Sequence, residues 1–181
     1  MTCSMDSSQN TSQQETHRHR YEIRQKPFSF DDNFTIKNEV GQDVYKVRSK
    51  IFSFGDKLVL ENMNGNALIK IQQESLHLHL TYNLLSAHDG DSDRLLAIVK
   101  KKLTILDEIF NIYSVYGKYT PKSSRSCVHS FKVMKDLRIV ATVNRERFGL
   151  SDIYNVDLVD DEDQAFILAL VIVLGRVLYD K

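Results

Sequence analysis

From Tyr21 onward, hydrophobic and polar residues alternate in short runs that recur about every 24 residues. The run Phe28-Ser29-Phe30-Asp31-Asp32 returns as Phe52-Ser53-Phe54-Gly55-Asp56, and weaker copies begin at Leu76, Leu103 and Phe148. Strict alternation predicts β-strands with one buried face, and a fixed period predicts a repetitive architecture. After each copy comes a second alternating run: Phe34–Ile36, Leu58–Leu60, Tyr82–Leu84, Phe110–Ile112 and Tyr154–Val156.

A turn signal and a third run follow most of these copies. Asn64-Gly65 leads to Leu68–Ile71 and Asp89-Gly90 leads to Leu96–Val99. Asn-Gly and Asp-Gly between alternating runs are the strongest short-range signals for a β-hairpin. The chain therefore predicts an antiparallel meander of about ten to twelve strands. A sheet of that size usually closes or splits into two layers, and closure removes its exposed edges.

The C-terminal stretch differs from all the others. Four acidic residues, Asp160 to Asp163, precede ten consecutive apolar residues, Ala165 to Leu174. A membrane span needs about 20 predominantly apolar residues, so this run is too short. Its Ile and Val content alone would also suit a buried strand. The carboxylates fit a helix start, and the length of the segment favours a buried helix over about 161–179.

Together these elements predict a mainly β fold, a closed antiparallel β-barrel of about twelve strands around a buried hydrophobic C-terminal α-helix. A barrel of this size is too wide for its own side chains to fill, and a central helix is one known solution. The little space left beside such a helix argues against a ligand-binding interior. Residues 1–20 are polar and predict a disordered tail, and residues 21–181 predict one domain.

The same residues resemble a known family. Phe28 to Lys37, Gly41 to Val47, Lys50 to Leu58 and the ending Asp160 to Asp180 are similar to the LURP-one-related family. That resemblance covers residues 21–180 and implies the fold of tubby C-terminal domains and phospholipid scramblases, a twelve-stranded barrel around a C-terminal helix. It also implies links to membrane tethering, phosphoinositides and plant defence. It is weakest between Tyr113 and Val128, where Pro121 and a Lys/Ser-rich run predict a long loop.

No motif of catalysis or cofactor binding stands out, and we expect a non-enzymatic protein without a cofactor. His77 and His79 would share one face of a strand, but no third metal ligand is indicated, so we expect no metal site. Asp89 to Asp93 starts like a calcium loop, yet Arg94 and Lys100 occupy the positions that need Gly and Glu. A polar hairpin loop is the better interpretation.

Charge gives the one functional signal. Lys plus Arg and Asp plus Glu both number 24, so no overall field favours nucleic acid, and we expect no nucleic-acid partner. Cations nevertheless gather in two windows, from Lys100 to Lys102 and from Lys122 to Arg147. Such residues attract anionic lipid if they share a surface, but they also suit the solvated outer face of strands. The candidate lipid-binding residues are Lys100, Lys101, Lys102, Lys132, Lys135, Arg138, Arg145 and Arg147.

The sequence thus predicts a binding or adaptor module. We expect it to dock on anionic, phosphoinositide-containing membrane surfaces or on an unidentified partner protein. The alternative, suggested by the scramblase relatives, is lipid scrambling, which would require the terminal helix to enter the bilayer. With two cysteines and no apolar signal segment, we expect a monomeric cytoplasmic protein, peripheral at the membrane where it docks.

Overall fold

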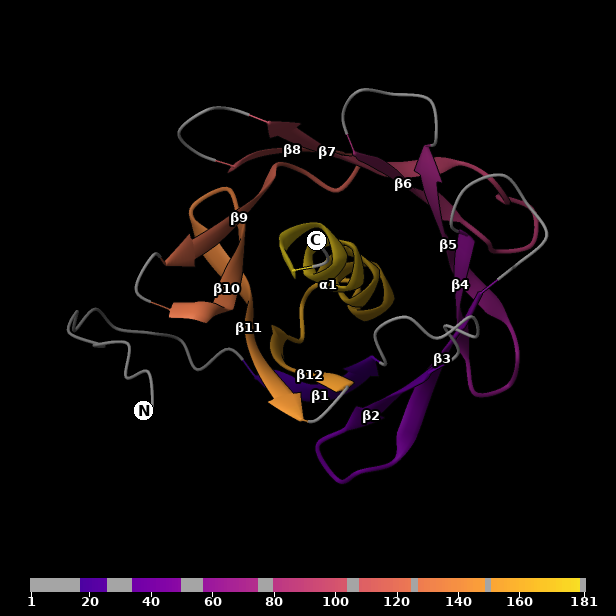
Figure 1. Ribbon diagram of the computed structural model, residues 1–181. Helices are drawn as coiled ribbons and strands as arrows, with labels where there is room; N and C mark the ends of the chain where they lie inside the picture. The colour runs from indigo at the N-terminus through magenta and orange to yellow at the C-terminus, as the bar shows by residue number, and fades with distance from the viewer. Residues whose placement is uncertain are drawn as a thin grey trace.

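Twelve antiparallel strands form a closed barrel around one helix (Figure 1). The computed structural model describes residues 17–25, 34–49, 57–74, 80–103, 108–124, 127–148 and 151–179. Its strands are β1 (Arg18–Gln25), β2 (Phe34–Asn38), β3 (Asp43–Ser49), β4 (Lys57–Asn62), β5 (Ala67–Glu74), β6 (Thr81–Ser86), β7 (Leu95–Leu103), β8 (Glu108–Ser114), β9 (Tyr119–Ser124), β10 (Cys127–Lys135), β11 (Arg138–Phe148) and β12 (Ser151–Val159). The helix, α1, spans Gln164–Tyr179. This confirms the predicted fold.

Each strand pairs with its sequence neighbours, and β1 closes the barrel by pairing with β12 along its whole length, from Arg18 opposite Val159 to Gln25 opposite Asp152. The strands β2, β4 and β6 begin at Phe34, Lys57 and Thr81, which keeps the predicted spacing. Of the repeated motif itself, Phe28–Asp32, Phe52–Asp56 and Leu76–His79 lie outside the described residues. The repeat therefore reflects one hairpin per period.

The turns predicted at Asn64-Gly65 and Asp89-Gly90 are confirmed, and the hairpins at Gly41 and Asp136 turn in a similar way. Gly41, Gly65 and Gly90 have positive φ angles of 80°, 84° and 84°, a conformation that glycine adopts without strain. Asp136 has a φ of 53°, also in the left-handed region, between β10 and β11. These turns lie at the same end of the barrel as the start of α1, because successive antiparallel strands return to the same end. We call it the turn end, and the opposite one the helix-exit end.

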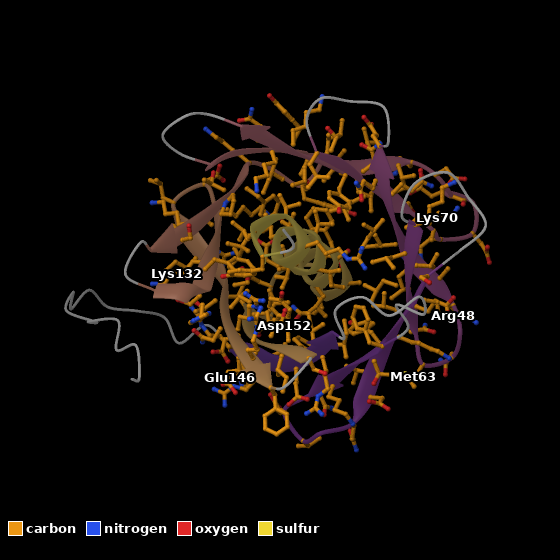
Figure 2. The ribbon with its side chains drawn as sticks, in the orientation of Figure 1. Arg48, Met63, Lys70, Lys132, Glu146 and Asp152 are labelled. Atoms are coloured by element: carbon orange, nitrogen blue, oxygen red, sulfur yellow. The ribbon has the colours of Figure 1, made fainter. Side chains whose placement is uncertain are left out.

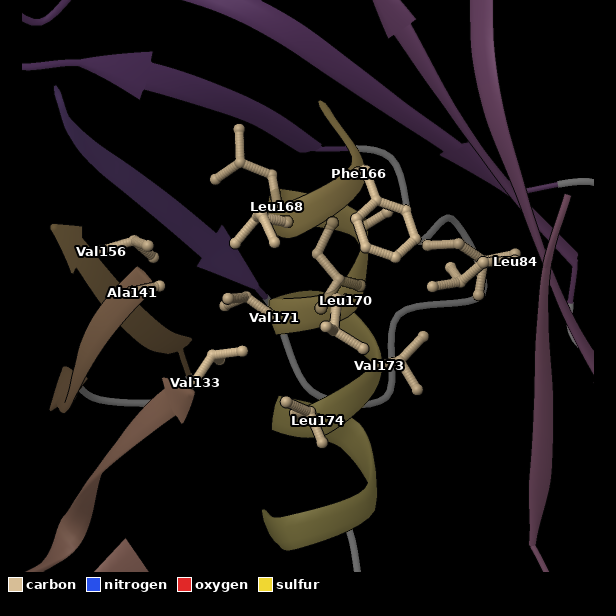
Figure 3. Close-up of a cluster of buried hydrophobic side chains, with 14 of the residues drawn as sticks. Leu84, Val133, Ala141, Val156, Phe166, Leu168, Leu170, Val171, Val173 and Leu174 are labelled. Atoms are coloured by element: carbon tan, nitrogen blue, oxygen red, sulfur yellow. The ribbon is translucent and has the colours of Figure 1, made fainter. Parts of the chain in front are cut away.

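The helix fills the barrel from one end to the other. All residues from Phe166 to Gly175 are buried, and Leu168, Leu170 and Leu174 are completely inaccessible to solvent. In Figure 3, Phe166 points toward Leu84 of β6, while Val171 points toward Ala141 of β11 on the other side. Fully burying each large apolar side chain stabilises the fold by about 1.5–3 kcal/mol. The helix is therefore the common core of all the strands.

The predicted acidic start of the helix is also confirmed. Asp163 is the N-cap, and its Oδ1 accepts a hydrogen bond from the backbone N–H of Phe166 at 2.9 Å. The neighbouring Gln164 side chain donates to the carbonyl oxygens of Val159 and Glu162, and its Oε1 accepts from the Tyr21 hydroxyl at 3.2 Å. The chain is thereby fixed as it turns from the barrel wall into the interior. Among the described residues, no helix is long and apolar enough to cross a membrane.

Two sequence-based expectations need adjustment. The long loop predicted between Tyr113 and Val128 was wrong, because this segment contains the end of β8, a short turn and the strand β9. Its proline, Pro121, lies opposite Val133 of β10. On its other side, the pairing described between β9 and β8 is Ile112 opposite Tyr119, and a weakly paired strand tolerates a residue without an N–H donor. The barrel also starts at Arg18, inside the predicted tail; the prediction of disorder for the rest of that tail stays a prediction.

Candidate lipid-binding surface

Two of the candidate cations neutralise the carboxylates at the start of α1. Lys135 Nζ lies 3.0 Å from Glu162 Oε2, and Arg138 donates to Glu162 Oε1 at 3.0 Å and to Asp161 Oδ2 at 2.6 Å. The Glu162 side chain is only 5% exposed, and it also accepts from the Tyr119 hydroxyl at 2.9 Å. Burial and this hydrogen bond raise the pKa of Tyr119 well above its usual range, and the Arg138 hydrogen bond lowers the pKa of Asp161.

Two further candidates lie at the opposite end of the helix. Lys101 donates from Nζ to the carbonyl oxygen of Val177 at 3.0 Å. Arg145 pairs with Asp152 at 2.7 Å, with the two side chains 9% and 10% exposed, and its guanidinium lies over the Tyr179 ring at 4.3 Å from the centroid. Cations are favourable at a helix C-terminus, where unpaired carbonyl groups carry partial negative charge. Lys101 and Arg145 therefore stabilise the core helix at its exit.

The remaining candidates are distributed over the outside. Arg147 is 72% exposed and lies 3.7 Å from Asp152 Oδ1. Lys100 is exposed on β7, and Lys132 lies on the outer face of β10, between the inward-facing Phe131 and Val133. Figure 2 shows Lys132 on the barrel wall, away from the helix. The side chain of Lys102 lies outside the described residues, and its backbone pairs with Ile109 of β8.

The register adds a lysine that the sequence did not single out as a site. Lys122 on β9 is exposed and lies directly opposite Lys132 on β10. The side chains of directly opposed residues share one face of a sheet, with Cβ atoms about 5 Å apart, and like charges in such a pair repel. Only the strand register reveals this pair, because ten positions separate the two residues in the chain. The net charge of the segment from Lys122 to Arg147 does not show that these two lysines lie opposite each other.

One aromatic residue accompanies these lysines. Tyr113 on β8 is exposed although it belongs to a barrel strand. β8 lies between β7 and β9. Tyr113 lies opposite Ile98, two residues along β7 from Lys100. Ile112 lies opposite Tyr119, so Lys122 lies further along β9, beyond the level of Tyr113. We call Lys100, Tyr113, Lys122 and Lys132 the wall patch. Within the described part of the chain, no carboxylate forms an ion pair with any of its three lysines.

Neighbouring carboxylates on the wall already have partners. Asp157 on β12 pairs with Arg20 at 2.9 Å, and Glu146 on β11 accepts a hydrogen bond from the Asn155 amide at 3.1 Å. Asp157 is thus neutralised by Arg20, and Glu146 is held at the Asn155 amide. The tyrosine of the wall patch has the amphipathic character that suits a membrane interface.

The possible metal ligands form no site in the described structure. His77 and His79 lie outside the described residues, and among those described no group of three or more His, Cys, Asp or Glu could hold a metal ion. In the loop between β6 and β7, Lys70 pairs with Asp93 at 2.7 Å and Arg94 pairs with Asp91 at 2.7 Å. Two of its three carboxylates are thus paired with cations of the protein itself. The segment joins the paired strands β6 and β7, which agrees with the interpretation as a polar hairpin loop.

The barrel and its helix agree with the comparison to known families. A family model described as LURP-one-related matches residues 19–175. The chain belongs to the LURP-one-related family. This family is not a known family of enzymes.

Among solved structures, this LURP-one-related protein is similar to an Arabidopsis thaliana protein known from X-ray crystallography. The two chains share 24% sequence identity with a TM-score of 0.63, over 90% of this chain and 92% of the other. At that identity the likeness extends to the fold alone. A comparison with curated proteins finds no match.

Proposed function

We propose that this LURP-one-related protein is a non-enzymatic binding module whose wall patch docks on anionic phospholipid head groups, phosphoinositides in particular. The observation that carries the proposal is the Lys122–Lys132 pair, two like charges directly opposite each other on a solvent-facing sheet. Such a pair weakens the strand pairing, and a bound phosphate group would turn this repulsion into a bridge between the two strands.

The expected binding is weak and reversible. A cation near an anionic membrane surface contributes about 1 kcal/mol, and this attraction falls off within a Debye length. Three lysines therefore support a peripheral, salt-sensitive association. Tyr113, exposed on the strand between them, would add contact with the head-group region. Scrambling would additionally require α1 to leave the barrel and expose its fully buried side chains, and no contact described above favours that.

Flotation with lipid vesicles tests the proposal. Wild-type protein should float with phosphoinositide-containing vesicles at low salt, stay behind with phosphatidylcholine vesicles, and be released by added salt. Lys122→Glu combined with Lys132→Glu should reduce the bound fraction at least tenfold, because it reverses both charges of the pair. Equal flotation of wild type and this double variant would exclude the wall patch as the membrane-binding surface.

A matched variant controls for net charge. Arg18→Glu combined with Lys46→Glu makes the same change on β1 and β3, neither of which adjoins β9 or β10 in the barrel (Figure 1). It should float nearly as well as wild type. A soluble inositol polyphosphate provides the second arm. If it binds the wild type tightly while vesicles do not, the ligand is a free phosphate compound and not a membrane.

A further inference from the structure

One threonine hydroxyl lies among the lysines of the barrel wall. Tyr119 is buried against the helix, and Pro121 lies opposite the fully buried Val133. Side chains alternate between the two faces of a strand, so Thr120 and Lys122 share the outer face of β9. Thr120 is partly exposed there. Its hydroxyl therefore belongs to the same surface as the Lys122–Lys132 pair.

Three lysines surround this hydroxyl. Lys118 and Lys122 lie two residues before and after Thr120, or about 7 Å of extended chain. Lys132 lies opposite Lys122 and is thus a diagonal neighbour of Thr120, at about 7–8 Å. Figure 2 shows Lys132 on the outside of the wall. Among the residues that the structure describes, no carboxylate pairs with any of these three lysines.

The residue after Thr120 makes it a candidate acceptor for a protein kinase. The chain has two prolines, and Thr120-Pro121 is the one place where a hydroxyl residue precedes a proline. Proline-directed kinases modify Ser or Thr in this position of an extended segment. β9 is already extended, and its pairing with β8 is Ile112 opposite Tyr119. The segment after Tyr119 therefore has to separate from β10 alone to enter a kinase cleft.

From this arrangement we infer that Thr120 is a phosphorylation site whose phosphate binds the surrounding lysines and releases the protein from anionic membranes. In the reaction, the Thr120 hydroxyl oxygen attacks the γ-phosphorus of ATP and the bond to the β-phosphate oxygen breaks. ADP leaves, and the hydroxyl proton passes to the carboxylate base of the kinase. The phosphate adds about −1.5 to −2 charges at pH 7 and accepts strong hydrogen bonds from cations.

The modification changes the charge of the wall patch. Its three lysines carry three positive charges, and a phosphate of about −2 leaves about one. The phosphate also takes the position between Lys122 and Lys132 that a lipid phosphate occupies in the proposed function. Added negative charge of this kind releases basic surfaces from anionic lipid. The release from membranes rests on the proposed function, whereas the acceptor site does not.

Phosphorylation of the folded protein tests the acceptor site. The purified protein is incubated with a mitogen-activated protein kinase, Mg²⁺ and ATP, and mass spectrometry locates the phosphate. Thr120 should carry it, and both Thr120→Val and Pro121→Ala should abolish the modification. Ser123→Ala, on the same strand but opposite the buried Phe131, should be modified like wild type. Wild-type protein without phosphate on Thr120 would overturn the inference.

Phosphorus NMR tests whether the lysines bind the phosphate, and it needs no lipid. The second pKa of a phosphorylated side chain is about 6, and nearby cations lower it because they favour the dianion. We expect this pKa to be lower in phosphorylated wild type than in phosphorylated Lys122→Gln/Lys132→Gln. Equal pKa values in the two proteins would overturn the contact between the phosphate and these lysines.

Flotation then tests the release from membranes. On phosphoinositide-containing vesicles at low salt, phosphorylation should lower the ratio of bound to free protein at least tenfold. Thr120→Glu should also lower it, while Thr120→Gln, which has the same size without the charge, should float like wild type. Equal flotation of phosphorylated and unmodified protein would overturn the proposed release. If unmodified protein does not float, the proposed function and the release both fail, and the mass spectra and the NMR titration still decide the acceptor site.

Discussion

At the scale of single residues, Glu162 is the carboxylate of the described structure that contacts the largest number of donor side chains. It accepts from Tyr119, Lys135 and Arg138 while its own side chain is almost completely buried. Removing one partner of a buried ion pair costs several kcal/mol because the other charge stays behind. Lys135 and Arg138 are partly exposed, so water recovers some of this loss.

We therefore expect Glu162→Gln to lower the free energy of unfolding by about 2 kcal/mol, measured by urea denaturation. Asp161→Asn provides the comparison, because Asp161 is about half exposed and shares the same arginine. It should cost less than about 1 kcal/mol. An equal effect of the two substitutions would mean that burial of Glu162 is unimportant.

The lowered pKa of Asp161 predicts a dependence of stability on pH. The Arg138 hydrogen bond favours the ionised carboxylate in the folded state, below the ordinary value of 3.8. The resulting stabilisation is complete above that value and is lost as pH falls through the lower folded-state pKa. In Arg138→Gln, the melting temperature should fall less between pH 5 and pH 3 than in wild type. Arg18→Gln, an exposed change on β1, should keep the wild-type dependence.

At the scale of elements, α1 is a helix whose side chains are surrounded by the inner face of the barrel. A charge in its middle has neither water nor a partner, and an unpaired buried carboxylate is among the costliest changes in a protein. Leu170→Asp should therefore unfold the whole domain, seen as loss of the β-sheet circular dichroism signal at 25 °C. Leu170→Met keeps the volume and should cost less than about 1.5 kcal/mol. A folded Leu170→Asp protein would contradict the role of α1 as the core.

The contacts at the two ends of α1 give four of the candidate basic residues a structural role. Lys101 and Arg145 lie at its C-terminus, and Lys135 and Arg138 lie at its N-terminal acidic block. Sequence reasoning counted these four as cations available to a membrane. Their assignment to lipid binding stays a prediction, but each already serves the protein's own structure. Lys100, Lys122 and Lys132 are the better candidates for substitution.

At the scale of the whole molecule, the fold was predictable because its signals are local or periodic. Alternation marks the strands, Asn-Gly and Asp-Gly mark the hairpins, and the all-apolar run after Asp163 marks the helix. The β9 strand was missed because Pro121 and its polar neighbours outweigh a short alternation. The wall patch was beyond prediction, since the Lys122–Lys132 pair depends on the strand register.

The position of α1 in the chain has a consequence for biosynthesis. Every strand buries its inner face against a segment made after all twelve of them, and β1 must wait for β12 before its edge is covered. Domains generally fold as they emerge from the ribosome, but here no earlier fragment contains a complete core. We therefore expect the nascent strands to lack a complete core, with β1 still unpaired with β12, until α1 has left the exit tunnel. We also expect chaperones that shield exposed strand edges to increase the yield of folded protein during translation.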